Sequence, residues 1–113
     1  MEIIKEKIPI HKLQEMAQKM FGDLVKAVVD VEQKIMAIGG ELHSDEEALL
    51  IESGSKQENL WGINLYPGIE GEDWIEFDSM INLRPSQGNR SRGIDDYKIR
   101  EKIIEIVNNL VER

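Results

Sequence analysis

The feature that most constrains the fold is a change in the period of the apolar residues. Over residues 10–21 they recur every three or four positions, as on one face of an α-helix. From residue 25 to 31 the period drops to two, which is typical of a half-buried β-strand. The helical period returns over about 95–111, where one stripe carries Ile99, Ile103, Ile106, Val107 and Leu110. The pattern predicts helices near both ends of the sequence and a sheet between them.

The central part of the chain is predicted to be mainly antiparallel sheet. Alternation and turn residues indicate strands at 25–31, 34–38, 48–52, 60–66 and 74–83, with a short edge strand at 2–6. The turns at Glu32–Gln33 and Ser53–Ser55 favour two hairpins. Connections this short leave no room for repeated helical crossovers between parallel strands. We therefore expect one α+β domain over residues 1–113, with about five strands and two helices, about 10–21 and 95–111, packed on one face.

Composition narrows the class of protein. The 113 residues include no cysteine, which excludes disulfides, thiol nucleophiles and cysteine-ligated zinc or iron–sulfur clusters. The N-terminal residues are acidic where a signal peptide is basic, and no apolar run approaches the roughly 18 residues of a membrane span. We expect a cytoplasmic protein with no membrane partner and no cofactor.

The charge of the chain is unevenly distributed. The formal net charge is −8, and residues 41–78 alone carry eleven acidic residues against one base, Lys56. An acidic chain repels the phosphate backbone, so nucleic acid is not an expected partner. The local net charge becomes positive between Arg84 and Arg92, where three arginines occur without an acidic residue.

This arginine segment, residues 84–93, is the most distinctive candidate site. Guanidinium groups match carboxylate and phosphate, and the neighbouring polar side chains add neutral donors. The candidate ligand-binding residues are Arg84, Ser86, Gln87, Asn89, Arg90, Ser91 and Arg92. The segment has neither the phosphate-binding P-loop nor the dinucleotide-binding glycine pattern. In the alternative interpretation, the arginines pair with acidic residues of 41–78 and only pin an irregular connection.

A second group of candidates consists of acid–base residues. His43 lies within Glu41–Glu47, among four acidic residues, and Glu76 and Asp78 lie on the polar side of the predicted strand 74–83. An imidazole beside carboxylates suits acid–base chemistry near neutral pH. The spacing matches no zinc or calcium motif, so we expect no metal site. A solvated acidic turn, with Asp45 capping a short helix, is the alternative.

Three strings in the sequence resemble a known family. They are Gly40–Asp45 (GELHSD), Gln57–Pro67 (QENLWGINLYP) and Phe77–Arg92 (FDSMINLRPSQGNRSR). They are similar to those of a small prokaryotic family described only as a domain of unknown function, and the resemblance spans nearly the whole chain. It implies a compact single-domain prokaryotic protein, and it carries over no activity, cofactor or catalytic residue.

Two functions remain open from the sequence. The first is binding of a small anionic ligand, phosphate or carboxylate, by the arginine segment, with or without an enzymatic step. The second is a non-catalytic interaction or homodimeric protein in which the arginines pin the loop. The sequence contains no recognisable set of nucleophile, base and orienting residue, so it leaves the question of enzymatic activity open.

Overall fold

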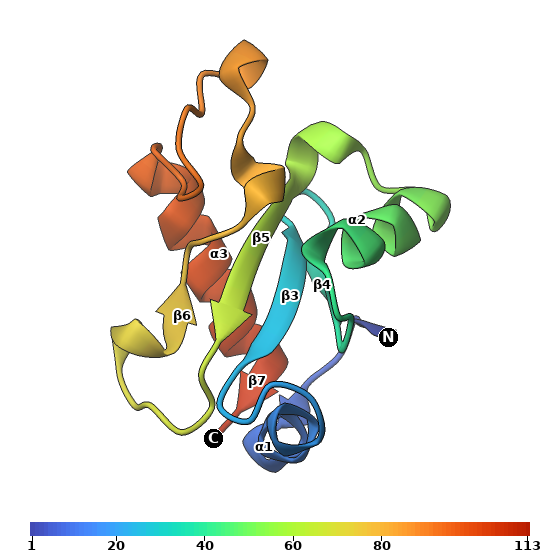
Figure 1. Ribbon diagram of the computed structural model, residues 1–113, viewed down its shortest axis with the longest axis vertical. Helices are drawn as coiled ribbons and strands as arrows, with labels where there is room; N and C mark the ends of the chain where they lie inside the picture. Colours follow the sequence, from blue (N-terminus) through green and yellow to red (C-terminus); the bar gives the residue numbers. More distant parts are fainter.

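The structure, a computed structural model that describes residues 1–113, is built on a five-stranded antiparallel sheet (Figure 1). Its strand order is β1 (Glu2–Ile4), β4 (Ile35–Ile38), β3 (Val25–Asp30), β5 (Leu60–Leu65) and β6 (Ile75–Glu76). All four pairings are antiparallel. A small parallel pair joins β2 (Ile8–Pro9) to β7 (Val111–Glu112) near the two termini. The predicted α+β class and the antiparallel sheet are confirmed.

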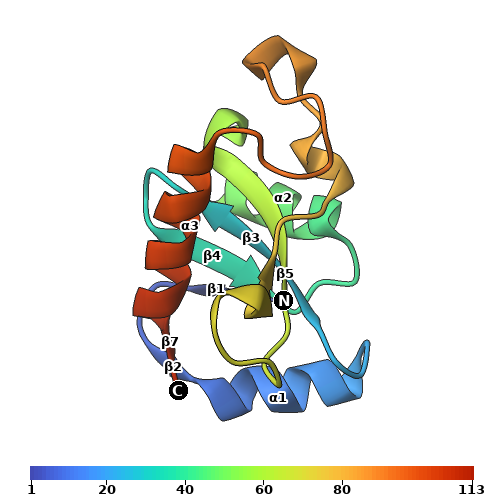
Figure 2. The ribbon, with the colours of Figure 1, turned by 90° about the vertical axis from the view of Figure 1, so that its left-hand side faces the viewer.

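The helices α1 (Ile10–Lys19) and α3 (Tyr97–Leu110) cover one face of the sheet, as predicted (Figure 2). They share a core of 19 buried residues with the strands, including Leu13 of α1 and Ile103 of α3. Asp96 caps α3, because its Oδ1 accepts a hydrogen bond from the Lys98 N–H at 2.9 Å. None of the helices has the length and apolar content needed to cross a membrane.

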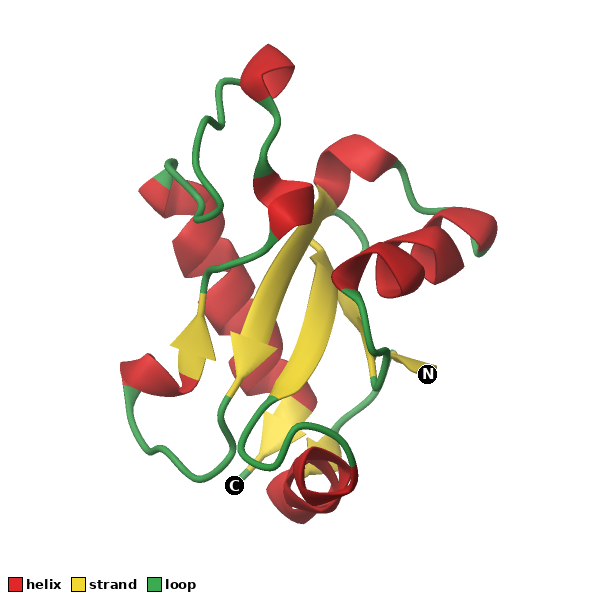
Figure 3. Cartoon of the chain, in the orientation of Figure 1, coloured by secondary structure: helices red, strands yellow, loops and turns green.

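A third helix, α2 (His43–Glu52), lies on the opposite face of the sheet (Figure 3). Its Leu50 packs with Val28, Ala37 and Leu60 in a separate core of four buried residues. The period of two assigns side chains to the faces: in β3, Val25, Ala27 and Val29 join the large core, whereas Val28 joins the small one. Both faces of the sheet are therefore covered.

The predicted strand 48–52 is wrong, because these residues form the C-terminal half of α2. A short apolar run fits a strand and a helix equally well, and here the buried positions Glu46 and Leu50 are spaced as on a helix. The acidic residues Asp45 and Glu46 also favour a helix N-terminus at this point. The second predicted hairpin is consequently absent, and β5 pairs with β3 instead.

The predicted strand 74–83 is also largely wrong, since only Ile75–Glu76 pairs with β5. Beyond it, the side chain of Asn82 replaces the missing strand, accepting from the Gly62 N–H at 2.8 Å and donating to the Gly62 carbonyl at 2.9 Å. A Cβ at Gly62 would lie 2.5 Å from the Cβ of Ser79, so only glycine permits this approach. The polar residues 78–84 therefore do not share one face of a strand.

Candidate functional site

Arg84, the first arginine of the arginine segment, is buried and points into the protein. Its Nε donates to the Ile81 carbonyl at 3.0 Å and its Nη2 to the Leu60 carbonyl, and it pairs with Glu47 at 3.4 Å. The guanidinium also lies over the Trp61 ring, 4.8 Å from its centre. Burial lowers the pKa of Arg84, and the Glu47 carboxylate opposes that shift. Arg84 thus fastens the segment to β5 and α2.

Other polar residues of the segment hold its own backbone. The buried Asn89 donates to the carbonyls of Asn82 and Gly93, and its Oδ1 accepts from the Asp95 N–H at 2.8 Å. Hydrogen bonds from the Ser91 hydroxyl and the Arg90 N–H lower the pKa of Asp95.

The remaining predicted ligand residues of the segment are exposed. Gln87 donates to the Glu58 carbonyl at 3.2 Å, while Ser86 and the guanidinium of Arg90 form no hydrogen bond. None of these three side chains lines any of the pockets described below.

Arg92 is the arginine of this segment that reaches a pocket. A cavity of about 220 Å³ lies between the start of α2, strands β3 and β5, and residues 78–81. We call it the polar pocket; its polar lining residues are Lys26, His43, Ser44, Asn64, Asp78, Ser79 and Arg92, and its apolar ones are Leu42, Met80 and Ile81. Arg92 Nε donates to Asp78 Oδ1 at 2.8 Å. Of the predicted site residues, the pocket brings together His43, Asp78 and Arg92.

Glu76, the third acid–base candidate, lies outside this lining. Its carboxylate accepts hydrogen bonds from the Asn64 amide at 2.9 Å and from the Tyr66 hydroxyl at 3.1 Å. Glu76 thus supports a lining residue of the pocket.

His43, the first residue of α2, is held in one tautomer. Its Nε2 lies 2.7 Å from the Ile63 carbonyl oxygen, and because a carbonyl only accepts, Nε2 carries the proton. Burial lowers the pKa of His43 and the charge of Lys26 adds to this effect, whereas the Ile63 hydrogen bond, Asp78 and a side-chain hydrogen bond with Asn64 oppose it. The ring is therefore neutral at neutral pH, and Nδ1 is its acceptor.

The start of α2, which lines the polar pocket, has unpaired backbone donors. The residue before the helix, Leu42, supplies no side-chain cap, and the first N–H groups bonded within the turn are those of Asp45 and Glu46. The N–H groups of His43 and Ser44 have no hydrogen-bond partner. Unpaired N–H groups and the helix dipole give this end of α2 a partial positive charge.

The charged side chains of the polar pocket sum to one excess positive charge. Lys26 and Arg92 are cationic and Asp78 is anionic, while His43 is neutral. Lys26 has no carboxylate partner; its ammonium lies over the Phe21 ring, 5.0 Å from the centre. A local excess of positive charge stands out in a chain whose net charge is −8.

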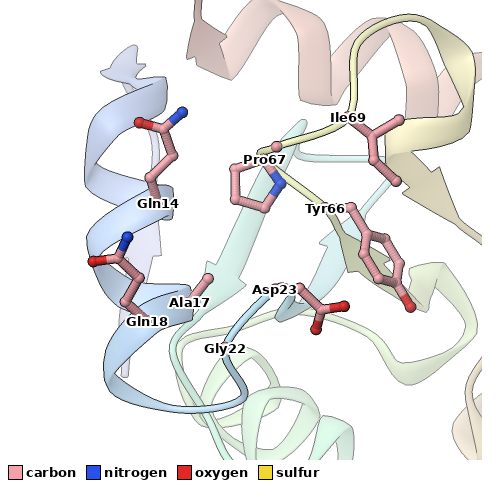
Figure 4. A pocket seen from close by; sticks show the side chains of 9 residues that line it. Gln14, Ala17, Gln18, Gly22, Asp23, Tyr66, Pro67 and Ile69 are labelled. Carbon is pink, nitrogen blue, oxygen red and sulfur yellow. The ribbon is translucent and has the colours of Figure 1, made fainter.

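A larger hollow of about 630 Å³ lies between α1 and residues 66–69 (Figure 4). Gln14 and Gln18 of α1 stand on one side of it, and Tyr66 and Asp23 on the other. No cationic side chain lines it, and carboxylates near Tyr66 add to burial in raising the pKa of that phenol. It therefore does not suit an anion.

Four polar lining residues of the polar pocket were not predicted as site residues from the sequence: Lys26, Ser44, Asn64 and Ser79. Asn64 is a polar residue in an otherwise apolar strand, and Lys26 faces it on the neighbouring strand. The pairing of these two strands would have indicated that Lys26 and Asn64 lie together. From the sequence, strand 60–66 was instead predicted to pair with strand 48–52. No group of three or more histidine or acidic residues is placed to hold a metal ion.

The chain belongs to a family described as protein of unknown function (DUF5674), whose model matches residues 2–110. The resemblance drawn from its sequence strings is thereby confirmed. Neither a protein of curated function nor a solved structure matches the chain.

Proposed function

We propose that this member of a family of unknown function binds a small anion, a carboxylate or a phosphate, in the polar pocket. The observation that carries the proposal is the pair of unbonded N–H groups, on His43 and Ser44, in a pocket that also holds Lys26 and Arg92. Backbone donors at a helix start, supported by cationic side chains, are a common way to bind carboxylate and phosphate.

The size of the pocket favours a compact ligand. Its volume is about 220 Å³, and inorganic phosphate or a short carboxylic acid fits this space. The net charge of the lining favours a ligand of charge −1.

The hydrogen bonds of the pocket favour binding over catalysis. The ring of His43 is bonded to the Ile63 carbonyl, and no serine or lysine is bonded to it. An activated nucleophile requires such a base within hydrogen-bond reach. Within the arginine segment, we propose that Arg92 contributes to the binding site. Arg84 and Asn89 instead hold the loop that joins β6 to α3.

The test compares two matched variants in thermal unfolding with phosphate, sulfate and acetate. Ligand binding to the folded protein raises the melting temperature with concentration. We expect Lys26→Met to lose this response, because it removes a lining charge and keeps the apolar stem. Arg90→Ala, which removes an exposed arginine outside the pocket, is expected to keep it. A parent protein that responds to none of these anions, or two variants that respond equally, would contradict the proposal.

A second proposed role, self-association, is favoured by the rim of the pocket. Leu42 and Met80 line it and are 54% and 63% exposed, and Leu42 continues into a neighbouring hollow with Met20 and Phe21. Contiguous exposed apolar residues mark interaction surfaces. Sedimentation should show a dimer that Leu42→Asp dissociates and that Ile51→Asp, altering an exposed apolar residue of α2, does not. A parent that is monomeric at high concentration would exclude this role.

A further inference from the structure

A second hollow adjoins the polar pocket, beside the end of α1 and the start of α2. Its volume is about 540 Å³. We call it the adjoining hollow; its lining residues are Lys19, Met20, Phe21, Lys26, Glu41 and Leu42. Lys26 and Leu42 also line the polar pocket, so the two hollows meet at these side chains. A ligand in the polar pocket can therefore extend into the adjoining hollow.

The apolar side chains of the adjoining hollow are partly open to solvent. Met20, Phe21 and Leu42 are 37%, 42% and 54% exposed, and none of them belongs to either buried core. Covering such side chains with an apolar group is favourable, because it removes apolar surface from water. Three exposed apolar residues that line one hollow thus suit the apolar part of a ligand.

The charged side chains of the two hollows match a single negative charge. They are three cations and two carboxylates: Lys19, Lys26, Arg92, Glu41 and Asp78. The ammonium of Lys26 lies over the Phe21 ring, 5.0 Å from its centre, so a cation lies where the polar pocket meets the apolar side chains. A ligand that spans both hollows is therefore complementary if one end is a monoanion and the other is apolar and uncharged.

We infer that the ligand of the polar pocket is a monocarboxylate that carries an apolar chain. This inference rests on the proposed anion binding. The carboxylate lies in the polar pocket, where Lys26 and Arg92 supply positive charge. The chain extends past Leu42 into the adjoining hollow and covers the Phe21 ring. Inorganic phosphate, by contrast, fills only the polar pocket and leaves these apolar side chains exposed.

The test is calorimetric titration of the full chain at pH 7.5 with acetate, butyrate and hexanoate, which differ only in the length of the apolar chain. In an open hollow each methylene is covered on one side, and we expect it to gain about twofold in affinity, from half the free energy of full burial. Hexanoate should then bind at least about tenfold more tightly than acetate. 1-Hexanol, which lacks the carboxylate, should bind more weakly than hexanoate. Inorganic phosphate reports anion binding that does not depend on a chain.

Two matched variants locate the chain. Phe21→Ser removes an aromatic ring from the adjoining hollow and no residue from the polar pocket. It should weaken hexanoate binding by about threefold or more, and should not weaken acetate binding. Tyr97→Ser removes an exposed aromatic ring outside both hollows and should leave both affinities unchanged.

The outcomes separate this inference from the proposed function. Equal affinities for acetate and hexanoate overturn the apolar contact and leave anion binding in place; if the protein then sediments as a dimer, a second copy covers the apolar side chains instead. Hexanol that binds as tightly as hexanoate overturns the placement of the carboxylate. If neither phosphate nor any carboxylate binds, both proposals fail. A Phe21→Ser variant that keeps the full preference for hexanoate overturns the placement of the chain; if this variant does not fold, the chain-length series of the parent protein decides.

Discussion

The two faces of the sheet are built from different chemistry. The face under α1 and α3 is apolar throughout, and its 19 buried residues form one continuous core. The face under α2 has a core of four residues, surrounded by polar groups. Buried polar residues on this side include Asp30, Glu46, Asn64 and Asn82.

The difference shows that, in a chain of 113 residues, the apolar core and most of the buried polar groups lie on opposite faces of the sheet. On the α2 face most buried polar groups are fully bonded: the Asp30 carboxylate, for example, accepts from two backbone N–H groups and from the Ser55 hydroxyl at 2.6 Å. Three buried atoms have no hydrogen-bond partner: Glu46 Oε1, Asn64 Oδ1 and Arg84 Nη1. We conclude that the apolar face supplies most of the folding free energy, and that the α2 face carries the polar pocket.

Replacing Arg84 tests whether some polar groups on the α2 face serve only to stabilise the fold. Its side chain and that of Glu47 are 9% and 14% exposed, so their pair is largely buried. Arg84→Ala should lower the free energy of unfolding by about 3–5 kcal/mol, because it leaves a buried carboxylate without its partner. Urea denaturation measures this loss, with Arg90→Ala as the exposed control. A loss below about 1 kcal/mol would make Arg84 dispensable for the fold, and loss of anion binding with stability intact would move it into the site.

Ile103 tests the apolar face. It is fully buried in α3, and Ile103→Ala should lower the free energy of unfolding by about 2–5 kcal/mol through lost burial and the cavity left behind. The matched control on the other side is Ile51→Ala in α2, which is 43% exposed and should cost well under half as much. Both are measured by urea denaturation. Similar losses at the two positions would contradict the division between the faces.

Glu46, a buried acid on the α2 face, should make the stability of the protein depend on pH. Burial raises its pKa to about 9, although the Gly40 N–H bonded to its Oε2 opposes the shift. Between its ordinary value and about 9, the folded protein holds a proton that the unfolded chain has lost, so stability falls as pH rises. Glu46→Gln removes this dependence, and its advantage over the parent should grow by up to about 1.4 kcal/mol per pH unit from pH 5 to 9.

Denaturation across that range measures the effect, with Glu52→Gln, an exposed residue of the same helix, as control. Parallel pH profiles for the parent and Glu46→Gln would show that Glu46 does not titrate as a buried acid.

The parts of the fold and of the candidate site that could be predicted from the sequence are those that depend on local interactions. The periodicity of α1 and α3 and the hairpin β3–β4 depend on near neighbours, and the sequence predicts them. The period-two pattern after Trp74 is misleading, because Asn82 and Arg84 bind the backbone of β5, a contact between distant residues. His43, Asp78 and Arg92 were found as candidates by residue type. These three residues line one pocket with Lys26 and Asn64 because α2 covers the face formed by β3 and β5. Local sequence patterns do not reveal that packing.

The most direct test of the account is an amide NMR titration of the ¹⁵N-labelled protein with phosphate, using acetate as a second ligand. If the α2 face holds the site, the largest shift changes should be at the N–H groups of His43 and Ser44, which gain a hydrogen-bonded anion, with smaller changes at Asn64. The amides of Gln14 and Tyr66 in the larger hollow, and of Gly88 and Arg90 in the arginine segment, should stay unchanged. Changes confined to residues 84–91, with His43 and Ser44 unmoved, would place anion binding in the arginine segment and contradict the account.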